Sequence, residues 1–299
     1  MPQSPIIFPL FGCEELADII LKKSGFLAGK ITAHQFPDEE SLIKLETDVN
    51  DRTVIFLANL NQPNAKILPL LFAAETAREL GASKVVLIAP YLPYMRQDKI
   101  FEAGEGITSK YFAKLLSGYF DGLITIDPHL HRWHDLNEIY TIPAFVLHAT
   151  DYIVNWIKLN VKSPILIGPD AESLQWVQDI AEKGDFPYLI LEKLRHGDSD
   201  VEISLPNIKR YLDLTPILID DIISTGMTLI MTIKQLQALK LRPPICIGVH
   251  GVFANDAYDK LLATGVDKII TCNTIPHISN GIDISDALIG SSAFKKPTF

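Results

Sequence analysis

Two adjacent carboxylates followed by a turn of small hydroxyl residues form the stretch of this sequence with the clearest chemical potential. The apolar residues 216–219 run into Asp220 and Asp221, and a helical pattern begins near Leu229. The turn consists of Ser224, Thr225, Gly226, Met227 and Thr228. A helix that begins after such a turn offers free backbone N–H groups and a favourable dipole to a phosphate, while carboxylates can hold sugar hydroxyls or a divalent cation. The stretch therefore indicates a site for a phosphorylated sugar, although an Asp pair alone is more often a strand end with a helix N-cap.

Basic and amide side chains follow another apolar run, at residues 84–90. Arg96 and Lys99 can meet the phosphates of a nucleotide, and the amide of Gln97 can hydrogen-bond to a base. The simpler interpretation is a solvated loop that carries two cations.

An aspartate and three histidines follow the apolar run that begins at Gly122. These possible metal ligands are Asp127, His129, His131 and His134. A single histidine beside carboxylates and phosphate oxygens can serve at a magnesium site, and the absence of a nearby cysteine argues against structural zinc. A surface cluster of histidines is the alternative.

Two further polar clusters follow apolar runs in the second half of the chain. Asp170 and Ser173 come after residues 165–168 and repeat the order strand, aspartate, turn and helix, which suits a diphosphate or a metal. Lys193 and Arg195 lie in a polar, glycine-containing stretch, which suits a mobile loop that closes over transferring phosphates. A helix N-cap and two exposed loop cations are the simpler interpretations.

Apolar runs that alternate with helical patterns must position these clusters. Strands are expected at residues 6–10, 31–36, 41–46, 53–59, 84–90, 122–127, 165–168, 188–191, 217–220, 245–250 and 268–272. Most of these runs lack polar alternation, which is typical of buried parallel strands. Ligands bind beyond the carboxyl ends of such strands, where the polar clusters lie. The fold class is therefore α/β with open parallel sheets.

The two halves of the chain carry similar series of strands. Residues 53–57, a helix and residues 84–88 parallel residues 217–220, a helix and residues 245–250. This pattern suggests an internal duplication with a break near residue 143. We therefore expect two doubly wound domains, at residues 1–143 and 144–299.

The composition limits the classes of partner. The chain has 299 residues and a formal net charge of −9, so it offers no general attraction to nucleic acid or anionic membranes. Its cysteines, Cys13, Cys246 and Cys272, are few and scattered, which favours a reducing compartment over a disulfide framework. No apolar run approaches the length of a membrane span. The expectation is a soluble cytoplasmic protein.

The order of these segments resembles one known family over nearly the whole chain. The matching segments are FPDEE, PYLPYMRQDK, DPH, PDAES, EKLR, ILIDDIISTGMT, HGVF and NTIP. They are similar to those of ribose-phosphate diphosphokinases, also called phosphoribosyl-pyrophosphate (PRPP) synthetases. A phosphoribosyltransferase would share the ILIDDIISTGMT turn but not the RQDK segment or the duplicated first half.

The resemblance implies a fold, a reaction and residue roles. The fold would be two domains like those of type I phosphoribosyltransferases, and the enzyme would transfer the diphosphoryl group of ATP to the C1 hydroxyl of ribose 5-phosphate with Mg²⁺. The residues implied for ATP are Phe36, Asp38, Glu40, Arg96, Gln97 and His129. Those implied for the metal are His129, Asp170 and, as a weaker candidate, Asp127. Lys193 and Arg195 would be the catalytic cations. Asp220 and Asp221 would hold the ribose hydroxyls, and Ser224, Thr225, Gly226, Met227 and Thr228 its phosphate. The resemblance also implies a homo-oligomer.

Three segments depart from the common family pattern. Met227 stands where a glycine is usual, Glu172 adds negative charge beside the expected diphosphate, and Glu39 replaces the glycine of an Asp-Gly-Glu sequence. These changes resemble a divergent, phosphate-independent branch of the family. The alternatives are a non-catalytic regulatory subunit, which the presence of Lys193 and Arg195 disfavours, and a phosphoribosyltransferase, which the first half disfavours.

Overall fold

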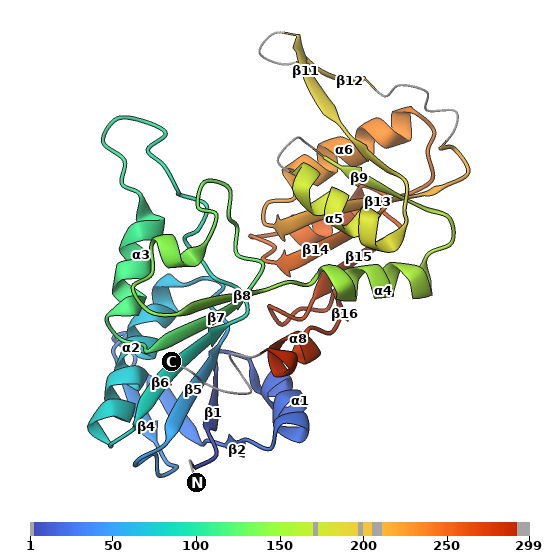
Figure 1. Ribbon diagram of the computed structural model, residues 1–299. Coiled ribbons are helices and arrows are strands. Elements are labelled where there is room, and N and C mark those ends of the chain that lie inside the picture. The colour runs from blue at the N-terminus through green and yellow to red at the C-terminus, as the bar shows by residue number, and fades with distance from the viewer. Residues whose placement is uncertain (1–2, 170–172, 197–199, 205–210, 292–299) are drawn as a thin grey trace. The chain divides into compact units, whose positions relative to one another are not determined.

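The chain divides into two compact units, which are described separately (Figure 1). The computed structural model describes residues 3–169, 173–196, 200–204 and 211–291, with the backbone alone at Gln175 and in 192–196 and 200–204. Unit 1 comprises Met1–His148, Thr274–Pro276 and Ser285–Phe299, and unit 2 comprises Ala149–Asn273 and His277–Ile284. The boundary expected after residue 143 precedes the division after His148, because the next strand still pairs within unit 1.

Unit 1 is built on a six-stranded parallel sheet with the strand order β2-β1-β5-β6-β7-β8. The strands are β1 (Ile6–Leu10), β2 (Leu27–Ala28), β5 (Thr53–Ala58), β6 (Lys84–Ala89), β7 (Gly122–Ile126) and β8 (Ala144–Leu147). The apolar runs at β1, β5, β6 and β7 become strands as the sequence predicts. Their continuous apolar character follows from burial on both faces, since every residue of β7 is buried.

A separate antiparallel hairpin lies between β2 and β5 in the sequence. It consists of β3 (Ile31–Gln35) and β4 (Ser41–Leu45), paired from Ile31–Leu45 to Gln35–Ser41. Most of its residues are exposed or half-buried. The two expected strands therefore exist, but they pair with each other rather than with the central sheet.

Helices cover the faces of the sheet in unit 1. They are α1 (Glu14–Ser24), α2 (Asn64–Glu79), α3 (Thr108–Ser117), α8 (Ser285–Gly290) and a short 3₁₀ helix, η1 (Leu136–Glu138). The helix α2 continues through Pro69, which lies early enough to cost a single backbone hydrogen bond. It ends before Gly81, whose φ of 89° suits glycine at this stop position.

Unit 2 repeats the same arrangement. Its six-stranded parallel sheet has the order β10-β9-β13-β14-β15-β16. The strands are β9 (Pro164–Gly168), β10 (Tyr188–Ile190), β13 (Thr215–Ile223), β14 (Ile245–Gly251), β15 (Lys268–Cys272) and β16 (Asn280–Ile282). A second antiparallel pair, β11 (Glu192–His196) and β12 (Asp200–Ser204), precedes β13. The helices are α4 (Thr150–Asn160), α5 (Leu174–Gly184), α6 (Met227–Ala238) and α7 (Ala257–Ala263).

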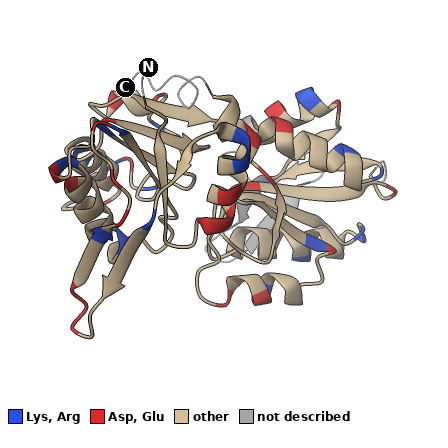
Figure 2. Ribbon diagram, turned by 90° about the horizontal axis from the view of Figure 1, so that it is seen from below, with Lys and Arg blue, Asp and Glu red and all other residues tan. Residues whose placement is uncertain are grey.

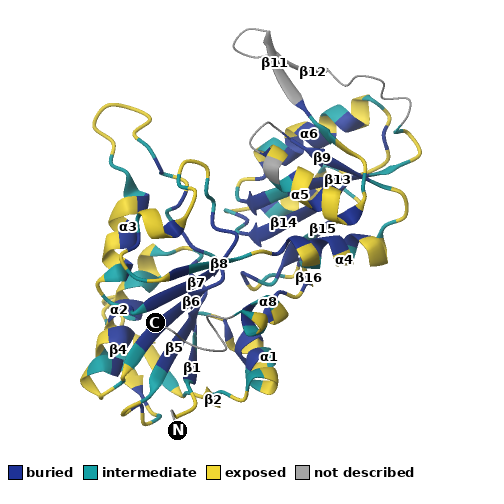
Figure 3. Cartoon of the chain, viewed as in Figure 1, coloured by how far each residue is buried: buried dark blue, intermediate teal, exposed yellow. Residues whose placement is uncertain are grey.

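Burial separates the strands from the outer surfaces of the helices. The strands of both sheets are mostly buried and the outward faces of the helices exposed (Figure 3). Charged residues gather on helices and loops, whereas the central strands carry few (Figure 2). None of the helices in the described part of the chain has the length and apolar character needed to cross a membrane. Both units are therefore α/β sheets with their polar groups at strand ends and on helix surfaces, as the sequence predicts.

Candidate active site

The two adjacent carboxylates lie within β13 rather than after it. Asp220 pairs with Gly248 of β14, and the ladder continues through Ile222 and Ile223. The expectation that the strand ends at Asp220 was wrong, because backbone pairing with β14 continues to Ile223, three residues beyond Asp220. The carboxylates therefore stand on a rigid strand close to its carboxyl end.

The two aspartates have different surroundings. Successive residues of a strand point to opposite faces; Asp220 is half-buried, whereas Asp221 is only 9% exposed. The Oδ1 atom of Asp221 accepts the backbone N–H of Ile222 at 2.8 Å. Asp220 also lies near the buried thiol of Cys246, whose pKa is raised to about 12, chiefly by burial and further by the charge of Asp220. A buried thiol with a raised pKa is a poor nucleophile.

The turn after β13 leads into an open helix N-terminus. Gly226 has a φ of 69° and precedes α6 without a side chain that could cap the helix, and the N–H of Met227 in the first turn makes only a long 3.5 Å contact with Thr225 Oγ1. A backbone hydrogen bond fixes the start of the turn, because the N–H of Ala254 donates to the carbonyl of Ser224 at 3.0 Å. The free N–H groups and the helix dipole make this turn suitable for a phosphate. Met227 begins the helix without a left-handed backbone conformation, so its position does not require glycine.

Three aromatic rings that were not identified from the sequence contact one another in the segments that follow β14 and β15. Phe253 donates its N–H to the carbonyl of Ile223, and its ring centroid lies 4.5 Å from that of His277 and 5.2 Å from that of Tyr258. Desolvation lowers the pKa of His277. The sequence segments HGVF and NTIP mark the ends of β14 and β15 but do not reveal that these rings meet.

The expected catalytic cations lie in a strand. Lys193 and Arg195 belong to β11 and pair with Ile203 and Val201 of β12. The sequence indicated an irregular loop here, and the structure instead shows an antiparallel hairpin. Their side chains, like all of Asp170, lie outside the described part of the structure.

In unit 1 the residues expected to bind adenosine occupy the tip of the β3–β4 hairpin. Phe36, Asp38 and Glu40 are all exposed. The N–H of Phe36 donates to the carbonyl of Glu40 at 2.7 Å, and the ring of Phe36 lies edge-on to His34 with a centroid distance of 4.8 Å. An exposed aromatic ring with two nearby carboxylates can stack on a base and accept its hydrogen bonds.

The side chains of Arg96 and Gln97, in the segment after β6, differ in exposure and in their contacts. The guanidinium of Arg96 is exposed, whereas the amide of Gln97 donates to Glu105 Oε2 at 3.1 Å. Backbone N–H groups of Glu102 and Phe101 lower the pKa of Glu105, and the amide of Gln97 adds to this. Glu105 therefore organises the segment as a carboxylate, and Arg96 is free to reach an anion.

At the end of β7 the candidate metal ligands are not equivalent. Asp127 has a fully buried side chain, and its Oδ1 lies 2.6 Å from Nδ1 of His148. His129 is half-buried and its ring packs against His131 with centroids 4.1 Å apart. His148 was not identified from the sequence, although its place just after the apolar run 144–147 is the same signal that marked the other clusters.

No group of three His, Cys, Asp or Glu side chains placed to hold a metal occurs in the described ranges. Mg²⁺ commonly takes one or two protein ligands and completes its shell with phosphate oxygens and water. His129 is half-buried, whereas the side chain of Asp127 is fully buried and lies against His148. The metal assignments to His129, Asp127 and Asp170 stay predictions.

Comparison with known proteins identifies the relatives of this chain. Residues 6–119 match the model of the N-terminal domain of ribose phosphate pyrophosphokinase, and residues 135–287 match that of the phosphoribosyl transferase domain. The ribose-phosphate pyrophosphokinase of Saccharolobus solfataricus is 32% identical over 82% of this chain and 84% of its own length. That of Sulfurisphaera tokodaii is 30% identical over 86% and 88%. The crystal structure of phosphoribosylpyrophosphate synthetase from Mycobacterium smegmatis has the same fold, with a TM-score of 0.84 and 22% identity over 96% of this chain and 97% of that one.

Proposed function

The chain belongs to the ribose-phosphate pyrophosphokinase family, and from that premise we propose that it transfers the diphosphoryl group of ATP to the C1 hydroxyl of ribose 5-phosphate. The products are PRPP and AMP. The observation that carries the proposal is the strand, turn and helix at residues 215–238, where two carboxylates precede a helix N-terminus that begins at a glycine. Carboxylates for a sugar beside N–H groups for a phosphate are the elements that ribose 5-phosphate requires.

The acceptor is bound by the end of β13 and the turn that follows it. The N–H groups and hydroxyls of residues 224–228 hold the 5-phosphate. Asp220 accepts hydrogen bonds from ribose hydroxyls, and the more buried Asp221 completes the site while it fixes the backbone at Ile222. The C1 hydroxyl is thereby positioned as the nucleophile.

The donor is bound by groups of unit 1. Phe36, Asp38 and Glu40 bind the adenine and ribose of ATP, and Arg96, Gln97 and His129 bind its remaining polar groups. His129 and Asp170 are the predicted ligands of Mg²⁺, which would neutralise charge on the phosphates when it is bound. Attack of the C1 oxygen on the β-phosphorus breaks the bond to the α-phosphate oxygen, AMP leaves, and the hydroxyl proton passes to solvent.

Lys193 and Arg195 stabilise the charge that develops on the transferring group. The reaction is substitution at phosphorus, so positioning and charge neutralisation supply most of the acceleration. No covalent nucleophile is needed, which agrees with the buried, protonated state of Cys246. The family resemblance further supports a homo-oligomer that works in the cytoplasm.

The test is release of AMP from the purified full-length chain with ATP, Mg²⁺ and ribose 5-phosphate. Lys193→Ala should lower kcat by about a thousandfold through loss of transition-state stabilisation. Lys268→Ala is the matched control, because Lys268 is an exposed lysine of the same unit at the opposite, amino-terminal end of a strand. It should leave kcat unchanged.

Two outcomes would overturn the proposal. Failure to release AMP with any nucleoside triphosphate would favour the non-catalytic regulatory subunit. Release of pyrophosphate from PRPP and a nucleobase, without formation of AMP from ATP, would favour the phosphoribosyltransferase.

A further inference from the structure

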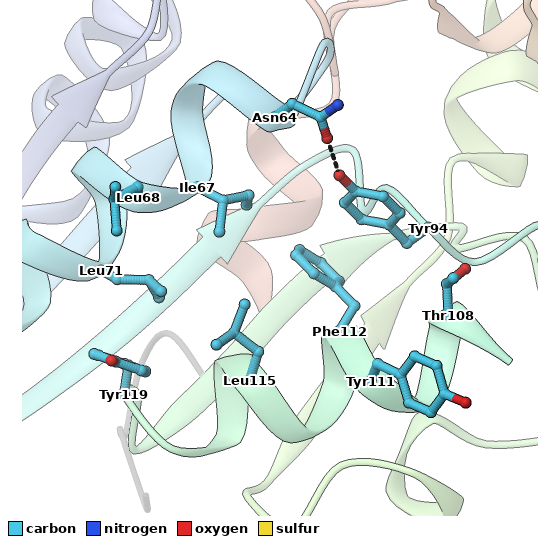
Figure 4. Close-up of a pocket in the computed structure, with 10 residues that line it drawn as sticks. All are labelled: Asn64, Ile67, Leu68, Leu71, Tyr94, Thr108, Tyr111, Phe112, Leu115 and Tyr119. Atoms are coloured by element: carbon cyan, nitrogen blue, oxygen red, sulfur yellow. Dashed lines mark hydrogen bonds between the residues drawn. The ribbon is translucent and has the colours of Figure 1, made fainter. Parts of the chain in front are cut away.

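The segment that carries Arg96 and Gln97 is fixed at its start by Tyr94 (Figure 4). The hydroxyl of Tyr94 donates to the side-chain oxygen of Asn64 at the start of α2, and its ring lies on Phe112 of α3 with centroids 4.8 Å apart. The backbone of Tyr94 has a φ of 63°, which a residue with a side chain keeps only where its surroundings enforce it. Two helices of unit 1 therefore hold the position from which Arg96 follows.

The same segment is fixed at its other end by a partly buried ion pair. Asp98 directly follows Gln97, and its Oδ1 accepts a hydrogen bond from Nη1 of Arg132 at 2.8 Å. The side chain of Asp98 is 2% exposed and that of Arg132 is 46% exposed. An ion pair on the open surface contributes little to stability, whereas a buried carboxylate that loses its cation is strongly destabilising. The pair therefore constrains the segment more firmly than a contact between two exposed side chains would.

A second connection joins this segment to the residues after β7. The indole N–H of Trp133 donates to Ser109 Oγ at 3.3 Å, and the N–H of Ser109 donates to the carbonyl of Gln97 at 3.3 Å. Ser109 is fully buried. Arg132 and Trp133 are adjacent and closely follow His129 in the sequence. Two neighbouring side chains of the segment that carries His129 thus reach Gln97 and the residue after it.

We propose that Arg132 and Asp98 are positioning residues for the nucleotide donor. The strands β6 and β7 are neighbours in the sheet, and the ion pair fixes the segments that follow them relative to one another. Arg96 and Gln97 are thereby held at a set separation from His129. A nucleotide that contacts both segments then meets polar groups already in place, and binding does not have to order them. This inference rests on the proposed function, which assigns these two segments to ATP.

The arrangement predicts an effect on the donor and none on the acceptor. The ion pair lies within unit 1, whereas the turn assigned to ribose 5-phosphate belongs to unit 2 and has its own backbone hydrogen bond between Ala254 and Ser224. Loss of the pair should therefore raise the KM for ATP and leave the KM for ribose 5-phosphate unchanged. A general loss of stability would not separate the two constants.

Isothermal titration calorimetry of the full-length chain with ATP and Mg²⁺, without ribose 5-phosphate, tests the inference. Arg132→Gln and Asp98→Asn should each raise the dissociation constant for ATP about tenfold, because the two segments are then no longer fixed to one another. The double variant should bind no more weakly than either single variant, since all three lack the same ion pair. Arg132→Lys keeps the charge but not the planar group of donors, so its affinity should lie between those of the wild type and Arg132→Gln.

Arg78→Gln is the matched control. Arg78 also forms an ion pair within unit 1, with Asp121 Oδ1 at 3.1 Å, but Asp121 precedes β7 whereas His129 follows it. The control should lower thermal stability and leave the dissociation constant for ATP unchanged. Circular dichroism establishes that each variant is folded at the temperature of the titration. Should Arg132→Gln fail to fold because a buried carboxylate is left unpaired, the double variant, which has neither charge, decides in its place.

Calorimetry needs no turnover, so this inference and the proposed function can fail separately. Wild-type affinity for ATP in the folded variants that lack the ion pair would overturn the inference and leave the proposed function intact. An equal rise in the KM values for ATP and ribose 5-phosphate would also overturn it, because the pair would then stabilise the whole chain rather than position the donor. A wild type that binds no nucleoside triphosphate would overturn the proposed function, and this inference with it.

Discussion

The two units share one strand order but end their third strand differently. The strand orders β2-β1-β5-β6-β7-β8 and β10-β9-β13-β14-β15-β16 are the same when the strands of each sheet are numbered along the chain. In both units an antiparallel hairpin comes before the third strand of the sheet. In both units the first strand pairs in parallel with the third, β1 with β5 and β9 with β13. The chain continues after β5 with Asn59, Leu60 and Asn61, whereas β13 carries Asp220 and Asp221 near its end. The matching order supports an internal duplication in which one copy alone carries the carboxylates.

The difference continues into the helix that follows. In unit 2 the turn at Gly226 leaves the N-terminus of α6 open. In unit 1 the ammonium group of Lys66, on α2, donates to the carbonyl of Asn59 at 3.0 Å and to the side-chain oxygen of Asn61. Partial burial lowers the pKa of Lys66. The same scaffold thus offers a turn suited to a phosphate in one unit and a turn occupied by the ammonium group of Lys66 in the other, so fold alone does not define a site.

The comparison is tested most strongly by removal of a carboxylate. Asp220→Ala should lower kcat/KM for ribose 5-phosphate about a hundredfold, because a charged hydrogen bond to a sugar hydroxyl contributes about 1.5–3 kcal/mol. Steady-state kinetics measures the effect. Asn61→Ala, at the corresponding strand end of unit 1, should leave KM for ribose 5-phosphate unchanged. Equal effects of both variants would contradict a functional difference between the strand ends.

A second test concerns the backbone of the turn. Gly226→Ala places a side chain at a φ of 69°, which costs about 1–2 kcal/mol and distorts the N–H groups around the phosphate. KM for ribose 5-phosphate should rise about tenfold. Gly12→Ala introduces similar strain in unit 1, at a φ of 90°, and its nearest new contact is an ordinary 3.8 Å to Pro276. It should lower stability without a change in that KM.

A third test uses pH. The pKa of His277 is lowered by desolvation in the folded state, so between that value and 6.5 the unfolded chain binds more protons. The stability that the neutral ring of His277 contributes to the free energy of unfolding is therefore present above pH 6.5. It is lost as the pH falls through the folded pKa. Urea unfolding of a Trp133→Phe variant, in which Trp156 and Trp176 report on unit 2, should show this loss, and a further His277→Phe substitution should reduce it. An unchanged pH dependence would show that the ring is not desolvated.

The smallest effect is expected for an ion pair at the surface of unit 1. Lys23 Nζ lies 2.7 Å from Asp286 Oδ1 and joins α1 to α8, but both side chains are largely exposed. Lys23→Ala should therefore lower the free energy of unfolding by at most about 0.5 kcal/mol. Chemical denaturation measures the change. A loss above about 2 kcal/mol would mean that α8 is held mainly by this pair rather than by apolar packing.

Local sequence patterns predicted the central strands well. Runs such as residues 85–89 and 245–249 are apolar throughout, and burial between two helical layers requires that character. The same rule failed at β11, because a strand in an isolated hairpin does not have to be apolar. The charged residues Lys193 and Arg195 leave no apolar run in β11 for the rule to detect. It also failed at Asp220, where pairing with β14 continues a strand that side-chain character alone would end.

Contacts between distant segments could not be predicted. The pairing of Asp127 with His148 depends on β7 and β8 lying side by side in register, and these residues are 21 positions apart. The meeting of Phe253 with His277 likewise depends on how two loops end at one edge of the sheet. Single segments thus indicated which residue types gather at strand ends, while the partners of each side chain follow from the tertiary structure.

The return of the last helix to unit 1 affects how the chain can fold during synthesis. Domains commonly fold in order as they leave the ribosome, the N-terminal one first. Here Lys23 and Asp286 are 263 positions apart, and Thr274–Pro276 and Ser285–Phe299 also belong to unit 1. Most of the residues of unit 2 therefore emerge while unit 1 still lacks α8. Unit 1 is therefore begun first and completed last, because α8 can pack on α1 only after most of unit 2 has been synthesised.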